Sequence, residues 1–484
     1  MNSNAYVAIL LFLACALLQG EIRALEPGTV STTDVAGLER PNVVIVMADD
    51  LGYRDVGCYG CIDFDTPNID ALAMQGIRCK SGYVSHPYCS PSRAGLITGK
   101  YQQSFGHEHN PPYDESNNEI GIDTATELLP AKMATAGYAT GLVGKWHLGA
   151  GVPFRPAGRG INEFYGFLGG GHHYIKTKVR GKHYDSPMWR NDRPTDDQLT
   201  YLTDDLTAEG ERFIERNQER PFCLLMMYNA PHAPDHVTEK YESRVSSIAH
   251  QGRRRYAALV QGVDEGVGRL RTKLKTLRLA DRTLFVFLSD NGGRSGVSDN
   301  RPLRGNKGWL HEGGIRVPFI VSMPGKLAQG TVYDKPVTAM DLLPTAMNLA
   351  GIEIPFHCVG LDLLPFLQGQ NPGAPHDSLY WRVCGGEGYA VRRGDWKLVK
   401  DVGMKRAELY DLGNDLAEDQ DLAATHPELV RSLQRQYSIW SESLEAPRWT
   451  ENHKDNTTKE RAAAQQAGTR QFPMPWVKTS PDSH

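Results

Sequence analysis

Two pairs of oxygen-bearing side chains, Asp49-Asp50 and Asp290-Asn291, have the types and positions for chemistry. Each pair follows an apolar run directly, NVVIVMA in the first case and LFVFLS in the second. Four oxygen ligands suit a hard divalent cation, and calcium is favoured over magnesium. Zinc would prefer histidine and cysteine ligands. Acids at strand ends also cap helices, and for any single aspartate that is the favoured interpretation. The paired pattern favours a metal site.

Cys89 opens the segment CSPSRAGLITG. Pro91 is typical of the first helical position, which places Cys89 at a helix N-terminus, where free amides and the helix dipole favour an anion. A structural or disulfide-bonded cysteine fits the same pattern. A thiolate nucleophile is a further alternative, although no histidine stands out nearby as its partner. The local pattern predicts an anion-binding helix start and leaves the role of the cysteine open.

The elements that must position these residues are buried strands. Three apolar runs predict them, at Asn42–Met47, Phe222–Tyr228 and Leu284–Leu288. A helical pattern over residues 259–274 precedes the last run, and strands that alternate with helices predict an α/β domain with a mostly parallel sheet. Ligands in such sheets bind beyond the carboxyl ends of the strands. We therefore expect Asp49, Asp290 and His232 to meet at that edge.

The C-terminal part has a different pattern. Turn residues at 369–375 (GQNPGAP) indicate a domain boundary. Short strand-like segments follow, at residues 378–383, 388–392, 396–400 and 408–411. A helical pattern then runs from Pro427 to about Leu444. We expect a small antiparallel sheet with a packed helix over residues 373–445 and an extended polar tail over residues 446–484.

Composition limits the class of protein. The 484 residues are 40% hydrophobic and 23% charged, as in soluble globular proteins, and the length predicts a large domain with a smaller partner. A formal net charge of -4 gives no general basic field, so we expect no nucleic-acid partner. Anionic substrates would need local cations. Arg253-Arg254-Arg255 opens a predicted helix and is interpreted as a solvated face, with attraction of a polyanionic glycan as the alternative.

The N-terminus predicts export. The apolar run Tyr6–Leu18 is too short to span a bilayer comfortably, and polar residues follow it. It indicates a signal peptide over residues 1–24 and no stable membrane insertion. The location would be periplasmic or extracellular in a bacterium, and lysosomal or secreted in a eukaryote. Export permits disulfides, and the candidate pairs are Cys358 with Cys384 and Cys61 with Cys79.

The segment CSPSRAGLITG resembles the motif of the type I sulfatases, whose Cys-x-Pro-x-Arg cysteine is oxidised to Cα-formylglycine before folding. Further segments resemble sulfatase segments in the expected order: PNVVIVMADDLGYRDVGCYG, GYATGLVGKWHLG, LSDNGG and LRGNKGWLHEGGIRVPFI. The resemblance covers about Pro41 to Leu444. It implies the α/β sandwich of the alkaline phosphatase superfamily, with a catalytic domain over residues 38–372.

The resemblance implies a role for each residue that matches a motif. The ligands that it implies for one calcium ion are Asp49, Asp50, Cys89 as formylglycine, Asp290 and Asn291. The catalytic residues that it implies are Cys89, Arg93, Lys145, His147, His232 and Lys307. Four further residues near these motifs are candidates for substrate contact, namely His172, His173, Asp235 and His236.

The chemistry that the resemblance implies explains these residue types. A hydrated formylglycine carries two hydroxyl groups on one carbon, and calcium lowers the pKa of the one that it binds. Asp290 would take the proton of that hydroxyl. The oxygen would then attack sulfur and expel the alcohol, while Lys145 and Lys307 neutralise the sulfate oxygens. His232 would protonate the leaving alcohol, and His147 would take the proton of the second hydroxyl so that sulfate leaves. A formylglycine-generating enzyme is implied as a partner during maturation.

The predicted function is hydrolysis of a sulfate ester by an EC 3.1.6-type enzyme. Residues 100–112 and the segment GFLGGGHHY resemble polysaccharide and glycosaminoglycan sulfatases more than those acting on aryl or steroid sulfates, so the substrate predicted is a sulfated carbohydrate. A phosphodiester or phosphonate monoester hydrolase is one alternative, because relatives on this fold also use formylglycine. A glycan-binding homologue without turnover is another, and the complete set of motif residues argues against it.

Overall fold

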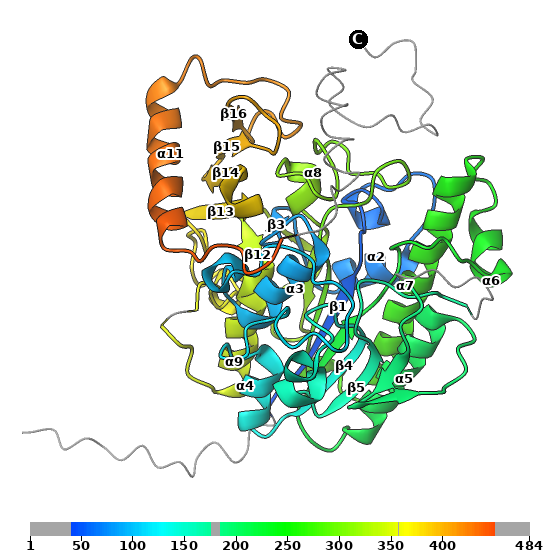
Figure 1. Ribbon diagram of the computed structural model, residues 1–484. Coiled ribbons are helices and arrows are strands. Elements are labelled where there is room, and N and C mark those ends of the chain that lie inside the picture. Colours follow the sequence, from blue (N-terminus) through cyan, green and yellow to red (C-terminus); the bar gives the residue numbers. More distant parts are fainter. Residues whose placement is uncertain (1–39, 176–183, 357, 451–484) are drawn as a thin grey trace, which may run out of the picture. The chain divides into compact units, whose positions relative to one another are not determined.

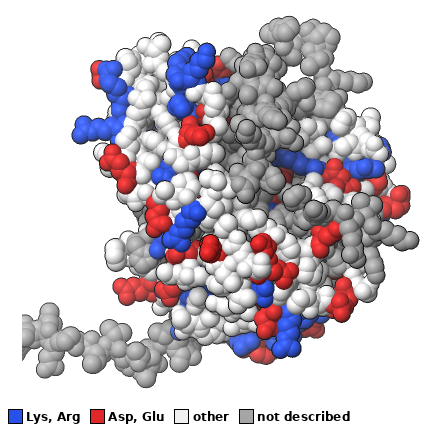
Figure 2. Space-filling model, in the orientation of Figure 1, with Lys and Arg blue, Asp and Glu red and all other residues white. Residues whose placement is uncertain are grey.

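The computed structural model describes residues 40–175, 184–356 and 358–450. The predicted signal peptide (1–24) and residues 451–484 of the predicted tail lie outside this part. Within the described residues, no helix is long and apolar enough to cross a membrane. On the face shown in Figure 2, acidic and basic side chains are interspersed, which is consistent with the small net charge.

A large central sheet has the strand order β11-β2-β10-β9-β1-β8-β4-β5-β6-β7 (Figure 1). Its parallel centre consists of β9 (Thr283–Ser289), β1 (Asn42–Ala48), β8 (Phe222–Met227), β4 (Ala139–Lys145) and β5 (Glu163–Phe167). The three apolar runs predicted as strands are therefore confirmed. Every residue of β1, β8 and β9 is buried, because helices cover both faces of the sheet.

Short strands extend the sheet at both edges. Beyond β9 lie β10 (Phe319–Ser322), β2 (Ile77–Cys79) and β11 (Thr331–Tyr333). Beyond β5 lie β6 (Met188–Arg190) and β7 (Arg193–Thr195). β10 pairs antiparallel with β9, and β6 pairs antiparallel with β5. The sheet is thus parallel at its centre and mixed towards its edges.

Two layers of helices cover the central sheet (Figure 1). One face packs against α2 (Pro67–Met74), α5 (Leu202–Arg216) and α7 (Gln251–Thr276). The other packs against α3 (Cys89–Thr98), α4 (Leu129–Thr135) and α9 (Leu342–Ala350). Side chains of β1 alternate between the two cores, with Val44 and Val46 in the first and Ile45 and Met47 in the second. Short helices in the connections are α6 (Glu239–Glu242), α8 (Glu312–Ile315) and α10 (Leu364–Leu367).

The C-terminal sheet is an antiparallel meander, as predicted. Its strands are β13 (Ser378–Val383), β14 (Gly388–Arg393), β15 (Trp396–Lys400) and β16 (Glu408–Asp411). One face packs against α11 (Pro427–Glu442) through Leu433. The opposite face packs against Tyr83 of β3 (Gly82–Tyr83), which pairs with β12 (Val337–Thr338), and against Leu310 and Ile315. The domain boundary after residue 372 stays a prediction.

Two expectations about side chains are wrong. Neither candidate disulfide forms, because Cys61 and Cys79 pack on opposite faces of the central sheet. Cys358 lies against the core near α9, with its Sγ 3.5 Å from the Gly99 carbonyl, whereas Cys384 follows β13 and is exposed. Arg253 is likewise not on a solvated face. It is 1% exposed and forms ion pairs with two aspartates, Asp55 and Asp63.

Candidate active site

The register of the parallel strands brings two acidic side chains together. Ala48 at the end of β1 is level with Ser289 at the end of β9, so Asp49 and Asp290 follow at the same edge of the sheet. Both carboxylates are fully buried. The Asp290 N–H donates to the Ala48 carbonyl at 3.0 Å, which continues the strand pairing to this point. The strand ends therefore hold two carboxylates in fixed positions away from solvent.

Asp50 and Asn291 lie beside this pair. Asp50 has a left-handed backbone with φ 66°, which costs a non-glycine residue about 1–2 kcal/mol. Its N–H donates to Asp290 Oδ1 at 3.2 Å, and Asn291 Nδ2 donates to Asp50 Oδ1 at 2.8 Å. Asn291 Oδ1 is buried and has no hydrogen-bond partner among the described residues. A buried acceptor without a donor is unfavourable, and a bound cation would satisfy it.

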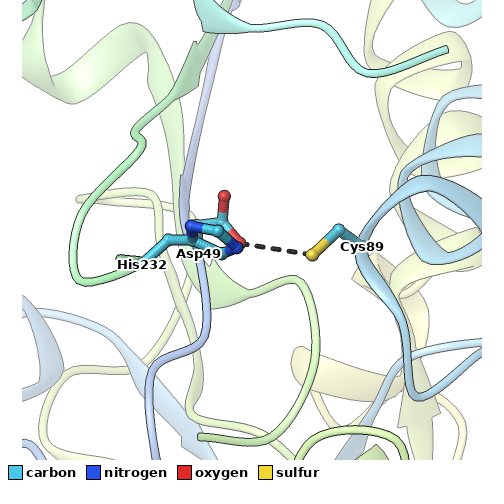
Figure 3. A group of neighbouring side chains, drawn as sticks. All are labelled: Asp49, Cys89 and His232. Atoms are coloured by element: carbon cyan, nitrogen blue, oxygen red, sulfur yellow. Dashed lines mark hydrogen bonds between the residues drawn. The ribbon is translucent and has the colours of Figure 1, made fainter. Parts of the chain in front are cut away.

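Cys89 reaches these acids from the start of α3. The helix begins at Cys89 itself, so Pro91 is its third residue and not its first as predicted. The shift is tolerated because the first four N–H groups of a helix have no partner within it. Cys89 Sγ lies 3.4 Å from Asp49 Oδ1 and 3.9 Å from Asp50 Oδ1, and Figure 3 shows the contact with Asp49. One atom each from Asp49, Asp50, Cys89 and Asp290 lies within 4.8 Å of the others.

Arg93 and Lys145 are buried cations that hold these carboxylates. Arg93 lies one helical turn after Cys89 and donates to Asp290 Oδ2 from Nε at 3.0 Å and from Nη2 at 2.8 Å. Lys145 is the last residue of β4, and its Nζ lies 2.5 Å from Asp49 Oδ2. The side chains are 3% and 0% exposed, respectively. Charge-assisted bonds of this kind fix the orientation of both carboxylates.

Lys307 comes from the segment after β9 and contacts both the acids and the cysteine. Its Nζ lies 2.9 Å from Asp50 Oδ2 and 3.2 Å from Cys89 Sγ. Glycine lets the backbone of this segment approach the end of β9. A Cβ on Gly292 would lie 1.8 Å from the Gly313 carbonyl oxygen, so no other residue fits there without a shift.

The surroundings keep the Cys89 thiol protonated. Burial and the Asp49 carboxylate raise the pKa of the Cys89 thiol far above its ordinary value, although Lys145 and Lys307 oppose the shift. Burial and Asp49 also raise the pKa of the Asp290 carboxyl to about 6. Because only the thiolate is a good nucleophile, unmodified Cys89 is poorly suited to attack. The thiolate alternative therefore loses support.

His232 follows β8 and lies beside Asp50. Its Nε2 is 3.7 Å from Asp50 Oδ2, and its Nδ1 donates to the Ala233 carbonyl at 2.6 Å. Burial lowers the pKa of His232 to about 3; Asp50 opposes this shift and Lys307 adds to it. The ring is thus neutral with its proton on Nδ1, which leaves Nε2 able to exchange a proton with a bound molecule.

His147 follows Lys145 by two residues and is also neutral. Burial lowers the pKa of His147 well below its ordinary value, and the cations Lys145 and Arg93 add to the shift. Its backbone is left-handed, with φ 58°. Its Nδ1 is buried and has no hydrogen-bond partner within the described residues. A Cβ on Gly170 would lie 2.7 Å from His147 Nε2, so the Gly-rich segment 169–171 packs closely over this ring.

The ring of His172 lies between two backbone carbonyls. Nδ1 lies 2.7 Å from the His173 carbonyl, and Nε2 lies 2.9 Å from the Ser186 carbonyl. Its own carbonyl accepts a hydrogen bond from Asn229 Nδ2 at 3.0 Å. These bonds hold the segment around His172 against the end of β8. Its predicted contact with substrate stays a prediction.

Three aromatic rings, those of Tyr184, His173 and His236, lie in a row beside His232. Tyr184 lies 6.3 Å from His232 and 6.0 Å from His173 between ring centroids. His173 stacks on His236 at 5.2 Å with an interplanar angle of 12°. Two of the residues predicted for substrate contact, His173 and His236, are therefore joined to the site through Tyr184.

Sequence reasoning missed two residues of this region. Asp235, a predicted substrate contact, forms an ion pair with Arg294. Arg294 directly follows the segment LSDNGG, and a cation at that place was a usable signal. Tyr184 lies outside every motif considered, and nothing in the local sequence indicated it.

The donor set fits a hard cation. Asp49, Asp50 and Asp290 supply carboxylate oxygens, and Asn291 supplies the buried oxygen that has no donor. Calcium and magnesium bind such oxygens, whereas zinc would prefer histidine or thiolate. The predicted ligands are therefore brought together in space, and their oxygen atoms fit a hard divalent cation.

The amino-acid sequence matches two family models. One describes sulfatases and covers residues 41–352, which is more than half of the chain. The chain belongs to the sulfatase family. The other model describes the C-terminal part of N-sulphoglucosamine sulphohydrolase and covers residues 305–440 of this sulfatase. The family comprises sulfuric ester hydrolases, and the two matches together span the central sheet, the site and the C-terminal sheet.

Named relatives align over different shares of this sulfatase. Arylsulfatase J of Mus musculus is 36% identical over 331 residues, which cover 66% of this chain and 54% of that protein. This sulfatase thus spans about half the length of that relative. N-acetylgalactosamine-6-sulfatase of Sus scrofa is 34% identical over 365 residues, covering 69% of this chain and 67% of that protein.

Solved structures share the fold of this sulfatase. The crystal structure of Ps i-CgsB in complex with k-i-k-neocarrahexaose superposes with a TM-score of 0.81 at 32% identity, covering 89% of this chain and 99% of that one. Phosphonate monoester hydrolase of Agrobacterium radiobacter gives a TM-score of 0.62 at 22% identity, covering 84% and 96%. That second likeness concerns the fold alone. The predicted alkaline-phosphatase-like sandwich is confirmed.

Proposed function

We propose that this sulfatase hydrolyses a sulfate ester of a carbohydrate, with formylglycine made from Cys89 and one calcium ion in the site. The observation that carries the proposal is the buried cluster at the sheet edge. Cys89 lies at the start of α3 with Asp49 Oδ1 at 3.4 Å and Lys307 Nζ at 3.2 Å from its sulfur. Three cations and a helix N-terminus offset the three carboxylates here, so a sulfate group would fit this position once calcium is bound.

Asp49, Asp50, Asp290 and Asn291 would hold the calcium ion together with residue 89. When bound, calcium polarises the oxygen that it contacts and lowers the pKa of a hydroxyl there. The chain's own hydrogen bonds arrange this set. Hydrogen bonds from Arg93 to Asp290 and from Asn291 to Asp50 already orient the carboxylates.

Formylglycine at position 89 would supply, as its hydrate, one hydroxyl to attack sulfur and a second whose deprotonation releases sulfate. Lys307 would contact the sulfate oxygens and neutralise their charge, since its Nζ already lies 3.2 Å from the side chain of residue 89. Lys145 is fully buried on Asp49 and would act on sulfate mainly through its field. Cation clamps of this kind stabilise charge that spreads over oxygens during group transfer.

Two neutral histidines would move the protons. His232 is bonded at Nδ1 to a backbone carbonyl, so Nε2 of the neutral ring carries no proton. Nε2 would first take up a proton from solvent and would then give it to the alcohol oxygen as the S–O bond breaks. His147 would accept the proton of the second hydroxyl of residue 89. The bond between the carbon that bears this hydroxyl and the sulfated oxygen would then break and release sulfate. The sum of these steps is a sulfate ester plus water giving alcohol plus sulfate. General acid and base groups contribute typically about 10²–10⁴-fold each.

The substrate class rests on relatives and on the rim of the site. The structural relative at 32% identity was solved with a neocarrahexaose, and one relative is named for N-acetylgalactosamine 6-sulfate. The ring row of Tyr184, His173 and His236 offers faces on which sugar rings stack. His172 and Asp235 would shape the same rim, since each is tied to a neighbouring segment.

Maturation and location follow from the same proposal. Formylglycine is made on the unfolded chain, because Cys89 is only 2% exposed once folded. A formylglycine-generating enzyme would therefore act before or during export. The predicted signal peptide over residues 1–24 would direct the chain to the periplasm, the lysosome or the medium, according to the host.

Sulfate release tests the proposal. The chain is co-produced with a formylglycine-generating enzyme, position 89 is checked by mass spectrometry, and defined sulfated glycans are supplied together with aryl sulfates. We expect release of inorganic sulfate from one glycan class, and none from Cys89→Ala. Faster cleavage of phosphonate monoesters or phosphodiesters than of any sulfate would favour the phosphate-ester alternative. Aldehyde at position 89 with glycan binding and no turnover on any ester would favour the non-catalytic alternative.

A further inference from the structure

Lys307 stands on a segment, residues 303–314, that we call the Lys307 loop. On its inner side the backbone is bonded to both halves of the site. The Lys307 N–H donates to the carbonyl of Gly293, which follows β9, at 2.9 Å. The Gly308 N–H donates to the carbonyl of Pro87, which precedes α3, at 2.9 Å. The position of the Lys307 backbone is therefore coupled to the loops that carry Asn291 and Cys89.

The outer side of the Lys307 loop is held by buried charges of the C-terminal sheet. Lys397 of β15 places its Nζ 2.9 Å from Glu312 Oε1 and 2.8 Å from Glu418 Oε1. The Glu312 N–H donates to Glu418 Oε2 at 2.7 Å. All three side chains are 0% exposed. Figure 1 shows α8, which Glu312 opens, beside this sheet.

Further bonds join the loop to the same sheet along its length. Near its start, Arg304 Nη1 donates to Tyr410 Oη of β16 at 2.7 Å. After Lys307, the Leu310 N–H donates to Asp401 Oδ2 at 2.9 Å, directly after β15. The Leu310 side chain also enters the apolar cluster between the sheet and the loop. The loop is thus bonded to the C-terminal sheet on both sides of Lys307, through Arg304 before it and through Leu310 and Glu312 after it.

Lys397, Glu312 and Glu418 form an ion triad, which restricts the position of the Lys307 loop more tightly than apolar packing would. Buried charges require fixed partners, because an unpaired charge in a dry interior is strongly unfavourable. Burial alone would raise the pKa of Glu312, but Lys397 and Arg316 lower it to about 2. Glu312 is therefore ionised, and a shift of the loop away from β15 would separate its carboxylate from Lys397.

We infer that Lys397 is a positioning residue: through Glu312 and Glu418 it holds the Lys307 loop so that Lys307 reaches residue 89. The C-terminal sheet then takes part in sulfate binding without touching the substrate. This inference rests on the proposed role of Lys307. A misplacement of about 1 Å at a group that contacts the reacting centre can cost about 10²-fold in rate.

The test substitutes Lys397→Met in the full chain, co-produced with a formylglycine-generating enzyme. Lys400→Met is the matched control, because Lys400 ends the same strand, is half-buried and donates from its Nζ to the Glu387 carbonyl at 3.1 Å. The readouts are kcat and KM for sulfate release, inhibition by inorganic sulfate, and hydrogen–deuterium exchange of peptides from residues 303–314 and from β1. Glu418→Gln is a second variant that keeps the shape of the triad and removes one charge.

We expect Lys397→Met to lower kcat/KM by about 10–100-fold and to weaken inhibition by inorganic sulfate. Exchange should rise in residues 303–314 and not in β1, and Lys400→Met should match the parent chain. Adding Glu418→Gln to Lys397→Met should recover part of the activity, because Glu418 loses its ion pair with Lys397, whereas Glu312 keeps one with Arg316 at 3.2 Å. If Lys397→Met fails to fold, Glu418→Gln alone should show the same local rise in exchange with a smaller loss of kcat/KM.

Unchanged kinetics in Lys397→Met, or a rise in exchange that is equal in β1 and in the loop, would overturn the inference while leaving the proposed function intact. The two proposals separate in the other direction as well. If the parent chain releases no sulfate and does not bind inorganic sulfate, the proposed function fails. A local rise in exchange would in that case still support the tie between Lys397 and the loop.

Discussion

At the scale of single residues, the charges of the site couple the proposed metal ion to an anionic substrate. Three carboxylates, Asp49, Asp50 and Asp290, face three cations, Arg93, Lys145 and Lys307, at short range. The chain by itself is therefore balanced. A divalent cation adds two positive charges in a buried volume, where an excess of one sign is unfavourable. A sulfate ester reduces that excess, so cation and substrate should favour each other's binding.

Removal of Asn291 Oδ1 tests the metal site at this scale. We expect calcium to raise the melting temperature of the parent chain, since a ligand at about a hundred times its Kd adds about 2.7 kcal/mol of stability. Asn291→Ala should weaken calcium binding by at least about tenfold. It removes Oδ1, the buried oxygen that has no hydrogen-bond donor, and it removes the hydrogen bond from Nδ2 to Asp50. The measurement is the melting temperature against calcium concentration after chelation.

Asn217→Ala is the control for this titration. Asn217 is a buried asparagine that bonds to Glu163 and to the Phe213 carbonyl near the end of α5. Its removal should lower the melting temperature and leave the calcium-dependent shift unchanged. The same calcium shift in Asn291→Ala as in the parent chain would rule out Asn291 as a ligand.

The residues that could be predicted are those at the ends of apolar strands. Asp49 and Asp290 were placed together correctly because parallel strands share one carboxyl edge. Tyr184 and Arg294 reach the same region from connecting segments, whose path is set by tertiary packing and not by local pattern. Arg253 was misjudged for the same reason: its buried partners, such as Asp55, are far away in sequence.

At the scale of elements, the long central strands were predictable and the short ones were not. β1, β8 and β9 have six or seven residues each, and a continuous apolar run makes up most of each strand. β4 ends in Gly144-Lys145, and the glycine interrupts its apolar pattern although the strand is fully buried. Edge strands such as β6 have only three residues, too few for a period of two to be recognised.

The helix α11 packs on the C-terminal sheet through Leu433 and through partly buried neighbours such as Val430 and Tyr437. Leu433 is its buried residue, and it packs against Val391, Leu398 and Leu409 of the C-terminal sheet. Leu433→Ala should lower the free energy of unfolding by about 2–5 kcal/mol, because it opens a cavity in this small core. Denaturant titration followed by circular dichroism measures the change. Ile439→Ala, on the same helix at 62% exposure, should change it by no more than about 0.5 kcal/mol, and equal losses in both variants would contradict the assignment.

At the scale of the whole molecule, the segment between the two sheets is fixed by one carboxylate. Asp341 stands at the start of α9, and its Oδ1 accepts bonds from His376 Nε2 at 2.8 Å and from the Leu361 N–H at 2.9 Å. Its Oδ2 accepts the Thr338 N–H at 2.8 Å. His376 lies shortly before β13, so this bond connects the chain that enters the C-terminal sheet to the helical layer of the central sheet.

This connection makes stability depend on pH in a defined direction. Burial alone would lower the pKa of His376, but the Asp341 carboxylate and, to a lesser extent, Asp377 raise it above its ordinary value of 6.5. A group whose pKa is raised in the folded state stabilises that state fully below its unfolded pKa. The contribution is then lost as pH rises through the folded pKa, so it is present below about pH 6.5 and fades above it.

His376→Gln isolates this contribution, because glutamine can still donate to Asp341 and does not titrate. We expect the free energy of unfolding of the parent chain to exceed that of the variant most at about pH 6 and the difference to shrink towards pH 9. Denaturant unfolding across that range measures it, with calcium and salt held constant so that metal binding does not enter. Other titrating groups shift both curves equally and cancel in the difference. A difference that is constant across the range would mean that His376 is not charged in the folded state, and the ion pair with Asp341 would then not connect the two sheets.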